Sequence, residues 1–114
     1  MPESKGQIIV IDDDDANRRG TDMALRKDGY AVAAFATGGE GLEHLRAHGA
    51  DLLIAECYFY RKPVRFHLNY PDIQAHRGQL RAKRLVLTHL GREMLEHKAE
   101  VAEECAYDGL RIEL

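Results

Sequence analysis

Acidic side chains gather at one point of the chain, directly after a short apolar run. Residues 8–11 are β-branched and uninterrupted by polar groups, and four consecutive aspartates follow at positions 12–15. Neighbouring carboxylates repel one another, so such a cluster lowers stability unless a cation or solvent relieves it. Carboxylate oxygens suit Mg²⁺, which takes one or two of them and keeps several waters. The run predicts either a Mg²⁺ site or a solvated acidic turn at a helix N-terminus, where the helix dipole favours aspartate.

Further polar residues follow other apolar runs. Glu56 comes directly after residues 51–55, and Thr88 closes the run 84–88, with His89 next. In parallel α/β sheets, working residues lie at the carboxyl ends of strands, near the point where the strand order switches. We therefore expect the residues at these strand ends to be the functional ones.

Apolar runs alternate with amphipathic segments along the whole chain. Strands are predicted at residues 8–11, 30–35, 51–55, 84–88 and 110–114, and helices at 17–27, 40–48, 71–80 and 91–105. The order β-α-β-α-β-α-β-α-β with short connections predicts a single α/β domain over residues 1–114. Its five strands form a doubly wound parallel sheet with helices on both faces.

Composition narrows the class of protein. With 114 residues the chain is too short for a barrel enzyme, which needs roughly 200, and its 45% hydrophobic content is that of a folded domain. A net charge of −3 offers no general basic field, so nucleic acid is not an expected partner. Apolar runs are too short for a membrane span and no signal peptide is visible, which predicts a cytoplasmic protein with reduced thiols.

The first half of the chain resembles a two-component response-regulator receiver domain. The resemblance covers about residues 6–56, in the stretches IIVIDDDDANRRG and LRKDGYAVAAFATGGEGLEHLRAHGADLLIAE. It implies a flavodoxin-like, receiver-like fold in which Asp12 and Asp13 hold Mg²⁺ together with Glu56. It also places Glu56 at the phosphoacceptor position and Thr88 at the position whose hydroxyl contacts the phosphoryl group.

Two departures from the receiver pattern bear on function. Glu56 stands where the family has an aspartate, and about 1 Å of misplacement in phosphoryl transfer can cost roughly 100-fold in rate. The family's lysine after the fifth strand has no counterpart, since no lysine follows Lys98 and Arg111 is not equivalent. These departures predict a pseudo-receiver that is not an enzyme and that acts by protein contact.

The second half carries a different resemblance, to the C-terminal part of metallo-β-lactamase-fold hydrolases. It spans about residues 49–114 and includes KRLVLTHLGREML and AYDGLRIEL. The resemblance matches His67 and His89 to histidines of that family, yet the principal ligand motif His-x-His-x-Asp-His is absent, so zinc is not expected. We therefore also consider a chimera of a receiver-like half (1–56) and a hydrolase-tail-like half (57–114), natural or engineered. The chimera would have no evolved activity; a degenerate hydrolase fragment is the third alternative.

The receiver resemblance also predicts an uncovered surface. Receivers end in a fifth helix that packs beside the first, and the predicted element order stops at a fifth strand. Apolar sheet surface left bare is rarely tolerated in soluble monomers. We accordingly expect self-association through that face, or a partner protein's helix packed onto it.

Overall fold

The computed structural model describes residues 5–57, 60 and 69–112 of the chain. Its elements in chain order are β1 (Gln7–Ile11), α1 (Asp15–Lys27), β2 (Ala31–Phe35), α2 (Gly38–His48), β3 (Ala50–Glu56), α3 (Tyr70–His76), η1 (Arg77–Gln79), β4 (Ala82–Thr88), α4 (Arg92–Glu96), η2 (Lys98–Glu100) and β5 (Glu104–Cys105). Within these described ranges, none of the helices has the length and apolar character needed to cross a lipid bilayer.

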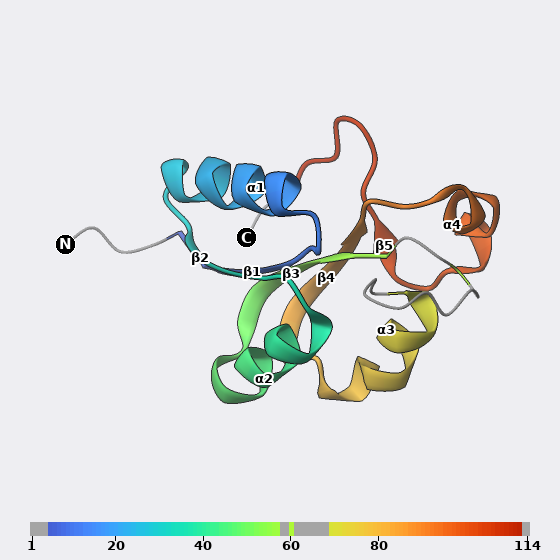
Figure 1. Ribbon diagram of the computed structural model, residues 1–114, viewed down its shortest axis with the longest axis horizontal. Helices are drawn as coiled ribbons and strands as arrows, with labels where there is room; N and C mark the ends of the chain where they lie inside the picture. Colours follow the sequence, from blue (N-terminus) through green and yellow to red (C-terminus); the bar gives the residue numbers. More distant parts are fainter. Residues whose placement is uncertain (1–4, 58–59, 61–68, 113–114) are drawn as a thin grey trace.

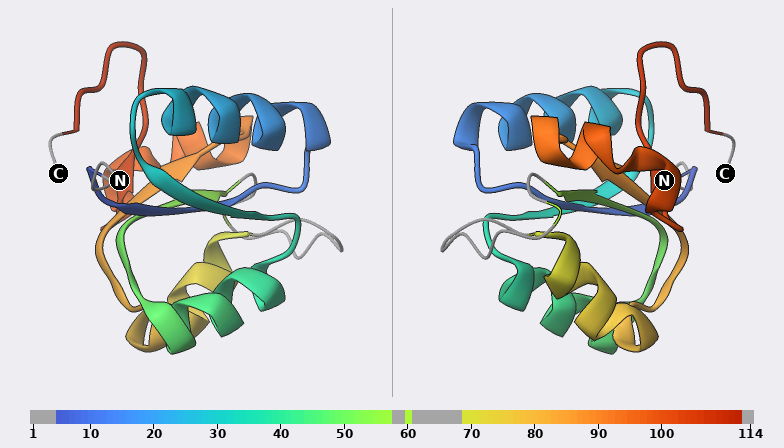
Figure 2. Two further views of the ribbon diagram at one scale, coloured as in Figure 1. Left: turned by 90° about the vertical axis from the view of Figure 1, so that its left-hand side faces the viewer. Right: turned by 90° about the vertical axis from the view of Figure 1, so that its right-hand side faces the viewer.

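All five strands belong to one sheet, in the order β2-β1-β3-β4-β5, and every neighbouring pair runs parallel. Helix α1 covers one face, and α2 and α3 cover the other (Figures 1 and 2). The predicted α/β doubly wound parallel sheet is confirmed. The strand order switches direction at β1, whose neighbours are β2 on one side and β3 on the other.

Local sequence signals explain where the helices begin and end. The Asp14 carboxylate accepts a 2.8 Å hydrogen bond from the backbone N–H of Asn17, which caps α1. At the start of α2, the Thr37 hydroxyl accepts from the backbone N–H of Glu40 at 3.3 Å. Helix α2 ends at His48 and is capped by Gly49, whose φ of 67° lies in the left-handed region that glycine adopts without strain.

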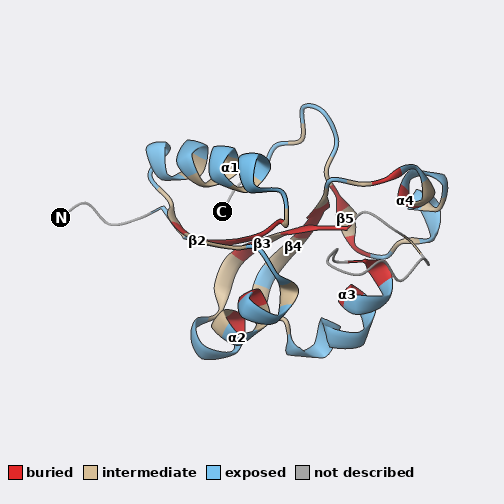
Figure 3. Ribbon diagram, in the orientation of Figure 1, coloured by how far each residue is buried: buried red, intermediate tan, exposed pale blue. Residues whose placement is uncertain are grey.

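The core consists of two apolar layers, one on each face of the sheet (Figure 3). Strand β1 contributes to both, because successive side chains point to opposite faces and residues 8–11 are each no more than 4% exposed. Leu45 of α2 and Ile73 of α3 pack against Ile9 and Leu53 on the α2–α3 side. This burial on both faces holds the carboxyl ends of β1 and β3 in fixed positions.

The last third of the chain departs from the prediction. The helix expected over 91–105 ends at Glu96, and the fifth strand is Glu104–Cys105 rather than 110–114. Glu103 is buried, where it accepts the Tyr70 hydroxyl at 2.6 Å and pairs with Arg77 at 3.1 Å. Glu104 forms a two-point ion pair with Arg84 of β4. These contacts outweigh the helix-forming preference of the segment.

The sheet face beside α1 is not bare as expected. Five of its apolar strand residues are at most 8% exposed, and Ala34 and Ile54 are partly buried beside them; the five are Ile8, Val10, Val32, Leu52 and Val86. The segment after β5 crosses to this side, where Ala106, Leu110 and Ile112 pack against the same cluster as Leu25 of α1 (Figure 1). The expectation of an uncovered face was wrong because this segment, part of which was predicted as a strand, covers apolar residues of the sheet beside α1. Self-association stays a prediction.

Gly41 tests the packing between α2 and β1. A Cβ at this buried helix position would lie 2.3 Å from Cδ1 of Ile11, whereas one at the exposed Gly20 of α1 would meet nothing within 4 Å. We expect Gly41→Ala to lower the free energy of unfolding by about 1–3 kcal/mol through overpacking. Gly20→Ala is expected to raise it by about 0.5–1 kcal/mol. Denaturant unfolding of both variants measures the difference, and a stabilised Gly41→Ala protein would contradict the close approach.

Candidate functional site

The parallel register places the predicted site residues at one edge of the sheet. Ile11 of β1 lies opposite Ala55 of β3, so the next residues, Asp12 and Glu56, come out side by side. Glu56 in turn is paired in register with Thr88 of β4. The ladder continues one residue further, because the N–H of Cys57 donates to the carbonyl oxygen of Thr88 at 2.8 Å.

Four potential ligands converge at this edge. One ligand atom from each of Asp12, Asp13, Glu56 and His89 lies within 4.8 Å of the other three. The group spans a gradient of exposure: Glu56 is 1% exposed and Asp12 7%, Asp13 is intermediate, and His89 is at the surface. The site is therefore open to solvent on the histidine side and closed by the core on the glutamate side.

Hydrogen bonds and charges orient these side chains. Asp12 Oδ1 accepts from the backbone N–H of Asp14 at 2.9 Å, which tightens the turn leading into α1. Arg18 of α1 donates to the backbone carbonyl oxygen of Asp12 at 3.0 Å. On the other side, Nδ1 of His89 lies 3.7 Å from Oε2 of Glu56. The turn before α1 and Arg18 of α1 thus hold Asp12, while His89, the residue after β4, lies beside Glu56.

Sequence reasoning anticipated part of this arrangement. The structure brings Asp12, Asp13 and Glu56 together as predicted and places Thr88 beside Glu56 in register. It adds His89 as a possible ligand: the sequence placed His89 among the strand-end residues expected to be functional, but related it as a metal ligand only to the zinc hydrolases. The signal available was its position directly after Thr88 at a strand end. His67 lies outside the described residues.

Arg111, the cation that the sequence offered after the predicted fifth strand, does not lie next to the strand that the structure shows. Because β5 ends at Cys105, the residues that follow the strand are Ala106 and Tyr107, and Arg111 lies well beyond it. Arg111 is therefore not at the position where the receiver pattern has its lysine. Neither Ala106 nor Tyr107 supplies a positive charge at the sheet edge.

The residues of the cluster fit Mg²⁺. Three carboxylates supply the hard oxygen ligands that Mg²⁺ prefers, and an open side leaves room for the waters that it retains. Held this close, the carboxylates repel one another, and a divalent cation offsets that repulsion.

Cys57, the residue after Glu56, is buried and does not belong to the cluster. Burial raises the pKa of its thiol to about 12, with smaller contributions from Cys105 and from nearby acidic groups that include Glu56. Its Sγ lies 3.8 Å from the Met94 Sδ in the core. The thiol is a packing group, because a thiol with so high a pKa supplies very little thiolate nucleophile.

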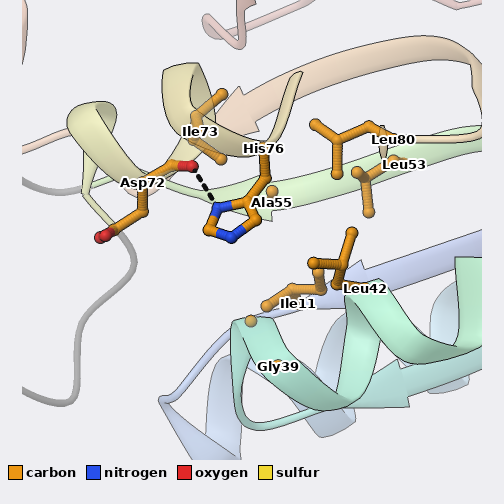
Figure 4. Close-up of a pocket in the computed structure, with 10 residues that line it drawn as sticks. Ile11, Gly39, Leu42, Leu53, Ala55, Asp72, Ile73, His76 and Leu80 are labelled. Atoms are coloured by element: carbon orange, nitrogen blue, oxygen red, sulfur yellow. Dashed lines mark hydrogen bonds between the residues drawn. The ribbon is translucent and has the colours of Figure 1, made fainter. Parts of the chain in front are cut away.

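A separate cavity of about 290 Å³ lies between α2 and α3, beneath β1 and β3 (Figure 4). Most of its lining is apolar: Ile11, Leu42, Leu53, Ala55, Ile73 and Leu80. At one side, Nδ1 of His76 donates to the carbonyl oxygen of Asp72 at 3.0 Å. Its lining residues include none of the four ligand residues, although Ile11 and Ala55 directly precede Asp12 and Glu56.

Solved structures similar to this chain share its fold over nearly its whole length. The chemotaxis protein CheY4 of Vibrio cholerae has a TM-score of 0.64 at 19% identity and covers 96% of this chain and 90% of its own. A CheY-like receiver domain of Methanospirillum hungatei has a TM-score of 0.63 at 20% identity, over 95% of this chain and 85% of its own. The flavodoxin-like receiver fold, with strand order 2-1-3-4-5, therefore extends across residues that the sequence suggested to be hydrolase-like.

Sequence similarity to curated proteins is confined to 49 residues. The transcriptional regulatory protein CseB of Streptomyces avermitilis is 39% identical over this stretch, and AfsQ1 of Streptomyces coelicolor is 37% identical. The stretch is 43% of this chain but 21% and 22% of those proteins, so the chain covers about a fifth of their length. No family model matches the chain. Neither these relatives nor the structures above support a metallo-β-lactamase-like half or a chimera.

Asp13 tests the electrostatics of the cluster, because its carboxylate is only partly buried and is one of the three that converge there. We expect Asp13→Asn to raise the free energy of unfolding of the metal-free protein by about 1 kcal/mol, since it removes one of three neighbouring charges. The same change is expected to weaken Mg²⁺ binding by about tenfold. Thermal unfolding and amide NMR shifts during a Mg²⁺ titration measure the two effects. Asp108→Asn, at an exposed position outside the cluster, is the control and should change neither.

The two cysteines test the burial of the sheet edge. Because burial raises the pKa of both Cys57 and Cys105, we expect a thiol reagent at about pH 8 to modify the native protein at least about 100-fold more slowly than the unfolded protein. The rate of release of a coloured thiolate measures this. Rapid modification of native Cys57 would show that this edge of the sheet opens to solvent.

Proposed function

We propose that this chain is a two-component response-regulator receiver module that holds Mg²⁺ but does not accept phosphate, and that signals by contact with another protein. The observation that carries the proposal is the convergence of Asp12, Asp13 and Glu56 at the carboxyl ends of β1 and β3 in a receiver fold. The sequence similarity to response-regulator proteins supports the same signalling context.

Mg²⁺ would be held by Asp12 and Asp13, with Glu56 completing the set. When bound, the ion supplies positive charge against which a phosphoryl group or a carboxylate can be held. The chain's own residues position the carboxylates: Asp14 and Arg18 fix Asp12, and the register of β3 with β4 fixes Glu56. The three carboxylates then form one anionic cluster whose net charge depends on whether the ion is bound.

Glu56 is poorly suited to accept phosphate for two reasons. Its carboxylate extends one methylene further from the strand than an aspartate would, and in-line phosphoryl transfer needs the attacking oxygen closely placed. It is also 1% exposed, so a phosphoryl donor arriving from solvent has little access to its oxygens. The absence of a cation at Ala106 removes a group that would hold a phosphoryl oxygen.

A fixed-state receiver transmits its signal through a partner that recognises its surface. No reaction step is assigned to this chain, which is proposed not to be an enzyme. The partner is proposed to be a protein, or a second copy of the chain, with no membrane or nucleic acid involved.

Incubation with acetyl phosphate and Mg²⁺ tests the assignment of Glu56. We expect the intact mass to stay unchanged, whereas Glu56→Asp, which shortens the side chain by one methylene, is expected to gain about 80 Da for one phosphoryl group. A Glu56→Gln variant is the control for adducts at other positions and should match the parent chain. A stoichiometric phosphoryl adduct on Glu56 of the unaltered protein would refute the pseudo-receiver proposal.

A further inference from the structure

His89 brings a nitrogen donor into a cluster of oxygen donors. It is the first residue after β4, with a φ of 52° that turns the chain at this point. One nitrogen of its ring lies within 4.8 Å of one carboxylate oxygen from each of Asp12, Asp13 and Glu56. The side chain is 36% exposed, so an arriving ion meets the imidazole before the buried glutamate.

The donor set discriminates among divalent cations. Mg²⁺ prefers oxygen ligands and gains little from an imidazole, whereas Zn²⁺, Co²⁺ and Ni²⁺ bind imidazole nitrogen well. The sequence argued against zinc because His89 had no partner ligands in the hydrolase pattern. The fold supplies three partners from an unrelated part of the chain, and this removes the reason for that expectation.

The distances are compatible with shared coordination. Ligand atoms about 2.1 Å from one ion lie roughly 3.4 Å apart in a tetrahedron and at most about 4.2 Å apart across the ion. The separation of 3.7 Å between His89 Nδ1 and Glu56 Oε2 falls inside that range. The widest separation in the group, up to 4.8 Å, needs a closure of about 0.6 Å, which rotation of the partly exposed Asp13 and His89 side chains can provide.

We propose that Asp12, Asp13, Glu56 and His89 form a site for a divalent transition-metal ion of the Zn²⁺ class, with His89 as the ligand that selects it over Mg²⁺. This inference deepens the proposed function and rests on the same acidic site. A Zn²⁺ ion bound there would tie the end of β4 to the ends of β1 and β3 and would exclude Mg²⁺. The charge state of the module would then respond to the transition-metal supply.

Zn²⁺ and Mg²⁺ titrations of the folded chain test the inference. His44 and His48 of α2 have ring centroids 4.5 Å apart and would compete for an added ion, and His67 lies outside the described residues. All measurements are therefore made in a His44→Asn, His67→Asn background. In that background His89→Asn is compared with the background itself, because asparagine tolerates the left-handed conformation that position 89 adopts. His76→Asn is the matched control, since His76 is exposed and lies outside the cluster.

We expect the background protein to bind Zn²⁺ more tightly than Mg²⁺ in calorimetry. His89→Asn is expected to weaken Zn²⁺ binding by at least about tenfold while Mg²⁺ affinity changes by less than about threefold. His76→Asn should match the background. With Co²⁺ as a visible probe, loss of the nitrogen ligand should shift the absorption bands in His89→Asn alone, and circular dichroism establishes that each variant is folded.

The inference is overturned if His89→Asn binds Zn²⁺ as tightly as the background, or if Zn²⁺ binds no more tightly than Mg²⁺. Its failure differs from failure of the proposed function. Mg²⁺ binding that depends on Asp13, with no role for His89 in Zn²⁺ binding, leaves the receiver proposal standing and removes this one. Tight, His89-dependent Zn²⁺ binding without any Mg²⁺ binding supports the metal site and refutes the Mg²⁺-holding receiver.

Discussion

Parallel pairing of β1 with β3, and of β3 with β4, is the constraint on which the site depends. Parallel strands end at the same edge of a sheet, so the acidic run after β1 and the glutamate that ends β3 must meet there. Bringing three carboxylates together is unfavourable by itself. The sheet enforces this arrangement because Ile9, Ile11 and Leu53 are buried in the present register of β1 and β3. If one strand slid by a residue, these side chains would leave the core.

The sequence predicted the first four strands well, for a physical reason. Each of those strands contains an apolar run, most fully buried in β1 and β3, and the polar residues that follow these runs are visible as sharp changes of composition. The final third was mispredicted because its conformation depends on partners far away in the chain. Glu103 and Glu104 are helix formers in isolation, yet their contacts with Tyr70, Arg77 and Arg84 hold them near or in an extended strand. Periodicity cannot show such partners.

The candidate site divides in the same way. Asp12, Asp13 and Glu56 could be found from their positions at strand ends, together with the resemblance of residues 6–56. His89 could be seen as a histidine at a strand end, but its carboxylate neighbours come from β1 and β3, and only the fold shows that they meet. The side chain that departs most from the receiver pattern, Glu56, is also the most buried of the four. The departure is therefore built into the core rather than confined to the surface.

The brevity of β5 affects how the molecule comes apart. Strands β1, β3 and β4 are joined by long runs of register pairs, whereas β5 is joined to β4 at Val86↔Glu104 and Leu87↔Cys105 alone. Segments with few ladder bonds open more readily than the body of a domain. Strand β5 and the segment after it therefore form the least protected part of the described sheet and would exchange amide hydrogens first. The carboxylate edge lies in the better protected portion, so the site would persist through openings that release the C-terminal segment.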